Sequence, residues 1–467
     1  MSDTLTLDAY AARTADGTEQ ANTLSPPVKY LVKGKLFYKR KWNYNTSKNT
    51  EKLKEYLPSA KIELHVQEWG ADKLKIFGSA TALTEKGEFL FKDVPPCKKL
   101  SVKVILDNKD GITQIKGNEN LVAKDDYELK KGKVIWRLVP LDEKKIKDAK
   151  TDEVDLGDVE IQPTADVDAD FAGLCDMYKT IWRGHNFIRE KAEHTLGACP
   201  VNYPVRTISY ESGKQLYILP GDIKDCDVLL HEYGHFIGEE MLGGLNHPGY
   251  SFDDDAAGQH GPNTEEHYES AWNEGHATFL SCAISDDPTY RDGYDSNLTM
   301  KLDSDNITLG PHCEGSIQCA LWDMLKVQGV DFKKGFWTAF KSSKRKGDTI
   351  FNFLENWKDE GCPDIDKLKA SLKKFNCHIG YTYTKKLKHG TKALDAAKPA
   401  EFKTLQELYD AYGKAAGGTL ADYSRELYNR NRYVGGGAFK EGNKATKGKF
   451  TLVAGTTYIV PERFEIK

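Results

Sequence analysis

The sequence lacks a long apolar run, a strong net charge and an N-terminal leader pattern. Its 467 residues include no stretch of roughly 18 to 20 apolar residues, the length that a membrane-spanning helix needs. Sixty-six Lys and Arg oppose 70 Asp and Glu, which excludes a broad basic field for nucleic acid. Because no secretory signal peptide is visible, we expect a cytoplasmic protein, one exported by a specialised system, or one whose signal has been removed.

Cysteine is present but scattered. The nine cysteines include no Cys-x-x-Cys pair, so neither a metal knuckle nor a dithiol redox motif is predicted, and mainly reduced, buried thiols are expected. Hydrophobic residues make up 39% of the chain and aromatic residues 11%, which is enough for packed cores. At roughly 150 residues per domain, the length predicts about three domains.

Changes in pattern divide the chain into four segments. Residues 1–27 are small and polar and predict a flexible tail. Residues 28–162 contain short alternating apolar runs separated by turn residues, a pattern typical of a β-sandwich. Residues 163–384 carry apolar residues at three- and four-residue steps and predict a mainly helical domain, whereas residues 385–467 predict a small α+β module. The expected fold class is multidomain α+β, with long helices at 171–191, 225–242 and 268–285.

One motif carries chemistry, the sequence HEYGH that begins at His231. On a helix, His231 and His235 lie on one face, one turn apart, where two imidazoles can hold one zinc ion. Glu232 is rotated by about 100° from His231, which lets its carboxylate reach a metal-bound water as the general base. Apolar residues surround this helix almost completely, so we expect it to be buried, and buried His and Glu side chains need partners.

A catalytic zinc needs a third protein ligand and one open position. The longer HExxHxxGxxH motif would require His where Met241 stands, which disfavours that form. Glu274 is the best candidate, because a lone acid on a small-residue face of a buried helix is costly unless it binds a cation. Other residues remain open as ligands: His247, His260, His267, His276 and the Asp253–Asp255 run.

The succession HEYGH, WNEGHATF and LWD resembles the gluzincin metallopeptidases, including thermolysin-like and fungalysin-like proteins, over about residues 200–360. The resemblance implies a zinc metalloendopeptidase with one catalytic ion held by His231, His235 and Glu274, and a protein or peptide substrate. It also implies a zincin fold for the central domain.

Amide hydrolysis by such a site also needs a neutral donor for the oxyanion. In gluzincins this donor is a downstream His or Tyr, and four residues lie in the matching part of the chain: His276, Tyr290, Tyr294 and His312. We take His312, which stands just before a predicted helix. Asp323 or Glu314 is expected to orient a ligating imidazole.

The flanking regions resemble known modules. Residues 78–106 and their neighbours resemble transthyretin-like and carboxypeptidase-regulatory-like β-sandwiches, which implies that this region braces or presents the catalytic domain. The C-terminal sequence from Thr404 resembles LysM modules, which implies contact with a glycan or a secretion apparatus.

The sequence therefore favours a zinc endopeptidase, with an exported effector or toxin as the accompanying hypothesis. Two other functions fit the same residues: a binding, adhesion or assembly-associated protein with a zincin scaffold, and a zinc hydrolase acting on a non-peptide bond. Glu232 argues against a scaffold, because a structural zinc site has no use for a base beside the metal.

Overall fold

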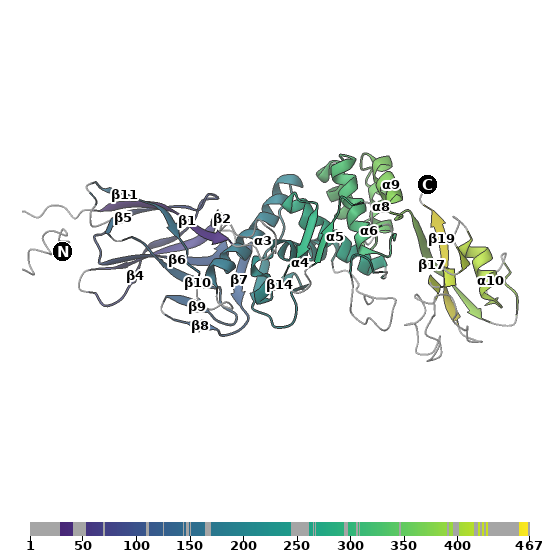
Figure 1. The fold of residues 1–467 in the computed structure, drawn as a ribbon, viewed down its shortest axis with the longest axis horizontal. Helices are drawn as coiled ribbons and strands as arrows, with labels where there is room; N and C mark the ends of the chain where they lie inside the picture. Colours follow the sequence, from purple (N-terminus) through teal and green to yellow (C-terminus); the bar gives the residue numbers. More distant parts are fainter. Residues whose placement is uncertain are drawn as a thin grey trace, which may run out of the picture. The chain divides into compact units, whose positions relative to one another are not determined.

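The computed structural model describes most of the chain from Lys29 to Glu465. Apart from single positions and short stretches within them, the described ranges are 29–40, 53–68, 71–108, 112–163, 170–243, 261–304, 307–344, 347–395, 401–427 and 457–465. The predicted tail, residues 1–27, lies outside the described residues. Sheets dominate the N-terminal part and helices the middle (Figure 1), which confirms the multidomain α+β class. In the described part of the chain, no helix is both long and apolar enough to cross a membrane.

A four-stranded sheet lies in the N-terminal part, in the order β11-β1-β2 with β5 also paired to β1. Burial alternates along β1, as expected of a strand with one face in a core. The strands are β1 (Tyr30–Arg40), β2 (Leu53–Tyr56), β5 (Glu88–Val94) and β11 (Glu153–Glu160).

A ten-stranded sheet follows the order β13-β14-β12-β7-β6-β10-β9-β8, with β3 paired to β6 and β4 to β3. Because β12 pairs with β7 in parallel, this sheet continues into the segment before the HEYGH helix. The strands are β3 (Ala60–Gln67), β4 (Lys75–Ala82), β6 (Lys99–Asn108), β7 (Thr113–Gly117), β8 (Val122–Ala123), β9 (Tyr127–Leu129), β10 (Trp136–Pro140), β12 (Cys199–Tyr203), β13 (Tyr210–Ser212) and β14 (Gln215–Tyr217). The packing of both sheets as one β-sandwich stays a prediction.

Two helices connect these sheets to the candidate site. Helix α3 (Phe171–Lys191) contacts β1, β7 and α4 (Cys226–Leu242). A buried ion pair joins sheet to helix, with Arg40 Nε 2.9 Å from Asp176 Oδ2, and Tyr38 donates to the same carboxylate at 3.0 Å. A Cβ at Gly184 would lie 2.6 Å from the Tyr233 ring, so glycine there permits the close packing of α3 on α4.

Several of the remaining helices share an aromatic core. Trp272 lies 5.1 Å from Phe353 between ring centroids, and its indole donates to the carbonyl oxygen of Gly347 at 2.9 Å. The helices of this region are α5 (Tyr268–Ser285), α6 (Glu314–Trp322), the π-helical turns η4 (Asp323–Val327) and η5 (Phe332–Trp337), α7 (Thr338–Phe340), α8 (Ile350–Asp359) and α9 (Ile365–Lys374). Two short strands, β15 (Thr289–Asp292) and β16 (Leu298–Lys301), lie between α5 and α6 in the sequence.

The C-terminal part is a small α+β arrangement. Strand β17 (Ile379–His389) pairs antiparallel with β19 (Thr457–Glu465) and parallel with β18 (Glu401–Phe402). Helix α10 (Leu405–Leu408) and the turn η6 (Tyr409–Gly413) follow β18. Leu387, Leu408, Tyr423 and Tyr458 belong to one buried cluster. The LysM-like role of this part stays a prediction.

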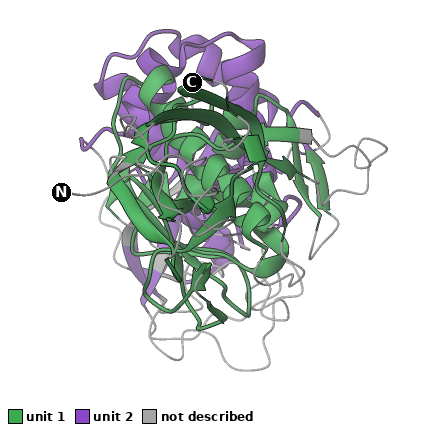
Figure 2. Cartoon of the chain, turned by 90° about the vertical axis from the view of Figure 1, so that its left-hand side faces the viewer, with its two compact units in different colours: residues 1–244, 280–300 green, residues 245–279, 301–467 purple. Residues whose placement is uncertain are grey.

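The chain divides into two compact units, shown in green and purple in Figure 2. The first comprises residues 1–244 and 280–300, and the second residues 245–279 and 301–467. The division falls within α5, so this one helix contributes residues to both units.

Candidate metal centre

The HEYGH motif lies in the middle of α4. Asp225 caps the start of the helix, because its carboxylate accepts from the backbone N–H groups of Asp227 and Val228 at 3.2 and 3.4 Å. Gly243 ends the helix with φ 73°, a left-handed conformation that glycine adopts without strain. His231 and Glu232 are each only 8% exposed, whereas His235 is half-buried, so the expected burial is confirmed for the first two.

The two motif histidines face each other. Their Nε2 atoms lie 3.0 Å apart, and their ring planes are at 90° with centroids 4.6 Å apart. Glu274, on α5, is 3% exposed. One ligand atom from each of His231, His235 and Glu274 lies within 4.8 Å of the other two. No other group of three His, Cys, Asp or Glu side chains with this spacing occurs within the described ranges.

This donor set fits one zinc ion. Tetrahedral zinc with ligands at 2.0–2.2 Å separates neighbouring ligand atoms by about 3.3 Å, close to the 3.0 Å between the imidazole nitrogens. Two imidazoles and one carboxylate are also a donor set of catalytic zinc sites, which keep a fourth position open. The chemistry of the three side chains and the distance between the two imidazole nitrogens therefore suit the metal.

His276, a further candidate ligand from the sequence, lies apart from this group. Its Nδ1 atom is 2.7 Å from the carbonyl oxygen of Trp272, and its ring packs against Phe340 with centroids 5.2 Å apart. His276 therefore lies in the aromatic core. The candidate ligands that fall outside the described residues are His247, His260, His267 and Asp253–Asp255.

Tyr290, one of the four residues considered as oxyanion donors, lies beside the motif. Its ring centroid is 5.8 Å from that of His231, and the side chain is 7% exposed. Burial raises the pKa of the Tyr290 phenol well above its ordinary value, and Asp225 and Glu232 are among the carboxylates that raise it further. The hydroxyl group therefore keeps its proton and can donate a hydrogen bond.

His312, the residue preferred from the sequence, is engaged elsewhere in the described part of the chain. Its Nδ1 lies 2.9 Å from the carbonyl oxygen of Glu266, and its Nε2 lies 2.9 Å from the carboxylate of Glu426. The ring also stacks on Tyr268 with centroids 3.9 Å apart. Its catalytic role stays a prediction, while Tyr294 lies outside the described residues.

Asp323, which was expected to orient a ligating imidazole, contacts α9 instead. Its carboxylate accepts from Ser371 Oγ at 2.6 Å and from Lys374 Nζ at 2.9 Å, both on α9. Burial acts to raise the pKa of Asp323, but these hydrogen bonds outweigh it and hold the pKa below its ordinary value. The aspartate of the LWD sequence therefore joins η4 to α9.

Asp227 fixes the first turn of α4 to the strand that carries Tyr290. Its carboxylate accepts from the backbone N–H of Arg291 at 3.0 Å, and its carbonyl oxygen accepts from Ser281 Oγ at 2.8 Å. Burial, followed by the charge of Asp225, raises the pKa of Asp227 to about 7.

We expect this carboxyl group to make the protein less stable as the pH rises from about 4 to about 7. Its folded-state pKa of about 7 lies above the unfolded value of about 3.9, so the folded protein holds the extra proton in this window. The loss reaches up to about 4 kcal/mol above the folded pKa. Urea unfolding of the wild type and Asp227→Asn at about pH 5 and about pH 8 measures it. An Asp227→Asn effect on stability that is equal at both pH values would contradict this assignment.

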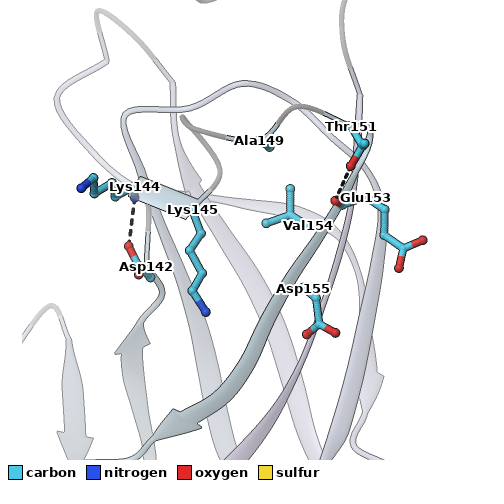
Figure 3. Close-up of a pocket in the computed structure, with 8 residues that line it drawn as sticks. All are labelled: Asp142, Lys144, Lys145, Ala149, Thr151, Glu153, Val154 and Asp155. Carbon is cyan, nitrogen blue, oxygen red and sulfur yellow. Dashed lines mark hydrogen bonds between the residues drawn. The ribbon is translucent and has the colours of Figure 1, made fainter.

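A hollow of about 470 Å³ lies on the N-terminal part, along the start of β11 (Figure 3). Lysines and acids of opposite charge line it together, and Lys145 Nζ donates to the carbonyl oxygen of Leu156 at 2.9 Å. Its described lining residues include no histidine and no cysteine, so the hollow does not offer a second site with the donor set of His231, His235 and Glu274.

One family model matches a segment of this chain. Residues 207–370 match the family model of the Mycolysin C-terminal domain, a segment that contains α4 and α5. No curated protein matches the chain. The major plantain pollen allergen Pla l 1 shares 11% identity, with 28% of this chain and 91% of the allergen covered and a TM-score of 0.17. A 9R-lipoxygenase from Cyanothece shares 13% identity, with 37% of this chain and 25% of the enzyme covered and a TM-score of 0.16.

The two structural similarities carry no functional meaning at these TM-scores. The family match has a different weight, because its residues include His231, Glu232, His235 and Glu274. Over residues 207–370, the chain is thus similar to a metallopeptidase-associated domain, which supports a protease.

Proposed function

We propose that the protein is a zinc-dependent endopeptidase that hydrolyses peptide bonds in protein substrates. The observation that carries this proposal is the convergence of His231, His235 and Glu274 within 4.8 Å, with the acid Glu232 next to one of them in α4. The similarity of residues 207–370 to a metallopeptidase-associated domain supports the same reaction class. We assign the three converging side chains as the ligands of one zinc ion.

Glu232 is the proposed general base. Zinc, when bound, supplies a Lewis acid that polarises a carbonyl group and makes water nucleophilic near neutral pH. The Glu232 carboxylate accepts a proton from the attacking water and passes it to the nitrogen of the leaving amine. Its position, about 100° around the helix from His231, directs it beside the metal ligands. Its burial, at 8% exposure, limits competition from bulk solvent.

Tyr290 is our proposed oxyanion donor, and His312 is the rival. We expect Tyr290→Phe to lower kcat by about 10²- to 10³-fold, the usual loss when one such donor is removed, with little change in KM. His312→Gln is expected to change kcat by less than about threefold, because both ring nitrogens of His312 are engaged by Glu266 and Glu426. Steady-state kinetics on one fluorogenic peptide measures both, with zinc content and thermal midpoint as controls. A large loss of kcat in His312→Gln with little loss in Tyr290→Phe would instead make His312 the oxyanion donor.

Hydrolysis of denatured proteins tests the proposed reaction. The purified, zinc-loaded protein is expected to cleave casein or gelatin at internal bonds, and a chelator is expected to stop the cleavage until zinc is restored. Mass spectrometry of new amino termini distinguishes peptide hydrolysis from attack on another bond. A zinc-loaded protein that generates no new termini from any unfolded substrate would contradict the proposal.

A further inference from the structure

We propose that Glu211, on the edge strand β13, is a specificity-determining residue that recognises a positively charged substrate group beside the scissile bond. The charged group is either a free α-amino group or a Lys or Arg side chain. This inference rests on the proposed peptidase function and deepens it by naming the substrate class.

The strand that carries Glu211 lies at the end of the ten-stranded sheet and contacts α4. Within the part of the chain that the structure describes, β13 pairs with β14 alone. Its second edge therefore presents backbone groups that an extended peptide can pair with. A peptide bound there would run beside the helix that carries HEYGH.

The register of the β13–β14 hairpin sets the direction of the Glu211 side chain. Glu211 is paired with Leu216, which is fully buried, whereas Tyr210 is paired with Tyr217. The two tyrosine rings stack with centroids 4.6 Å apart on the other face, where Tyr210 is 37% exposed. Because directly opposed residues share a face, Glu211 points to the buried side of the hairpin.

One hydrogen bond holds this carboxylate in place, and an ion pair of its donor residue continues to α4. Glu211 Oε1 accepts from the backbone N–H of Lys214 at 2.8 Å, and Lys214 Nζ lies 2.7 Å from Glu240 Oε2 in the last turn of α4. The hairpin is thereby joined to the motif helix. Among the described residues, Oε2 of Glu211 makes no hydrogen bond or ion pair, so one oxygen remains to accept from a ligand.

The charges around Glu211 favour a cationic ligand. The pKa of Glu211 lies above its ordinary value, chiefly because of burial. The Lys214 hydrogen bond and His235 act to lower the pKa, whereas Glu239 and Glu232 act to raise it. Strand β13 contacts α4, the helix of the proposed base and two proposed zinc ligands, so the Glu211 carboxylate lies in the electrostatic field of that helix. A half-buried acid near two other acids gains most from an ammonium or guanidinium partner, whereas a neutral group leaves it desolvated without compensation.

Matched peptides test this inference. One pair carries Lys or Gln next to the scissile bond, and a second pair has a free or an acetylated α-amino group there. We expect the zinc-loaded wild type to prefer the cationic member of at least one pair by about tenfold to a hundredfold in kcat/KM, as for a hydrogen bond to a charged group. The pair that shows the preference identifies the source of the charge.

Glu211→Gln is the matched variant, because Gln keeps the acceptor for the Lys214 N–H and removes only the charge. We expect it to reduce the preference to below about threefold while the neutral peptide is cleaved as before. Glu239→Gln, with the same change in charge on α4, is expected to retain most of the preference. Binding of the same peptides to the zinc-loaded Glu232→Gln protein, followed by fluorescence anisotropy, is expected to show the same preference without turnover.

The outcomes separate the two proposals. A wild type that cleaves no peptide overturns the peptidase function, while preferential binding of cationic peptides to Glu232→Gln would still support the role of Glu211. If the wild type cleaves the cationic and neutral peptides equally well, the Glu211 inference is overturned and the peptidase function is not. Wild-type kinetics alone decide this outcome. A preference that survives in Glu211→Gln, or that Glu239→Gln abolishes equally, also overturns it.

Discussion

The Glu232→Gln protein is expected to keep one zinc ion per chain and to lose about 10²- to 10⁴-fold in kcat, the usual contribution of a general base. Gln has almost the shape of Glu, so the buried helix α4 can retain its packing. Its amide cannot take a proton from water at neutral pH. Since Glu232 lies about 100° around the helix from His231, the substitution leaves the proposed ligands in place.

Kinetics and metal analysis of the same preparation check this result. Turnover of a quenched fluorescent peptide gives kcat, and elemental mass spectrometry gives the zinc content. Glu190→Gln makes the same chemical change at an exposed position of α3, where the side chain is 67% exposed, and is expected to leave both values unchanged. Loss of zinc from Glu232→Gln would mean that Glu232 is a ligand, and unchanged turnover would mean that it is not the base.

Glu274→Gln is expected to weaken zinc binding by at least about 100-fold. Changing a residue that only orients a metal ligand already weakens binding by up to about 100-fold, and a ligand itself contributes more. The substitution replaces the anionic member of the proposed donor set with a neutral amide. At the same zinc concentration, a 100-fold weaker site provides about 2.7 kcal/mol less stabilisation of the folded state. Activity at limiting zinc is expected to fall with the occupancy.

The zinc-dependent rise in thermal midpoint measures this loss, together with a direct zinc titration. Glu269→Gln, in the first turn of the same helix, is the matched control and is expected to bind zinc like the wild type. Unchanged affinity in Glu274→Gln would assign the third ligand to a different residue, such as His260 or His267.

The long helices were predictable because their packing pattern is local. The apolar residues of 171–191 and 268–285 recur at helical spacing over five turns, and these bounds agree with α3 and α5. The predicted start of the motif helix at Asp225 differs by one residue from α4, because Asp225 is the cap. The proximity of Glu274 to the histidine pair agrees with the sequence reasoning that a buried acid and the imidazoles of a buried helix need a common partner.

Features that depend on distant residues were not predictable. The strands between Cys199 and Tyr217 have three to five residues each, too few to show a period, and β12 becomes a strand by pairing with β7. Glu211 carried no signal, because its significance comes from the contact of β13 with α4. The sequence equally could not distinguish Tyr290 from His312, since the choice depends on which side chain folds back to His231.

Anomalous diffraction from crystals of the zinc-loaded protein, recorded on both sides of the zinc absorption edge, tests the metal centre most directly. We predict one zinc peak at about 2.0–2.2 Å from Nε2 of His231, Nε2 of His235 and a carboxylate oxygen of Glu274. A peak at another position, or a zinc ion bound by the two histidines without Glu274, would contradict the proposed centre.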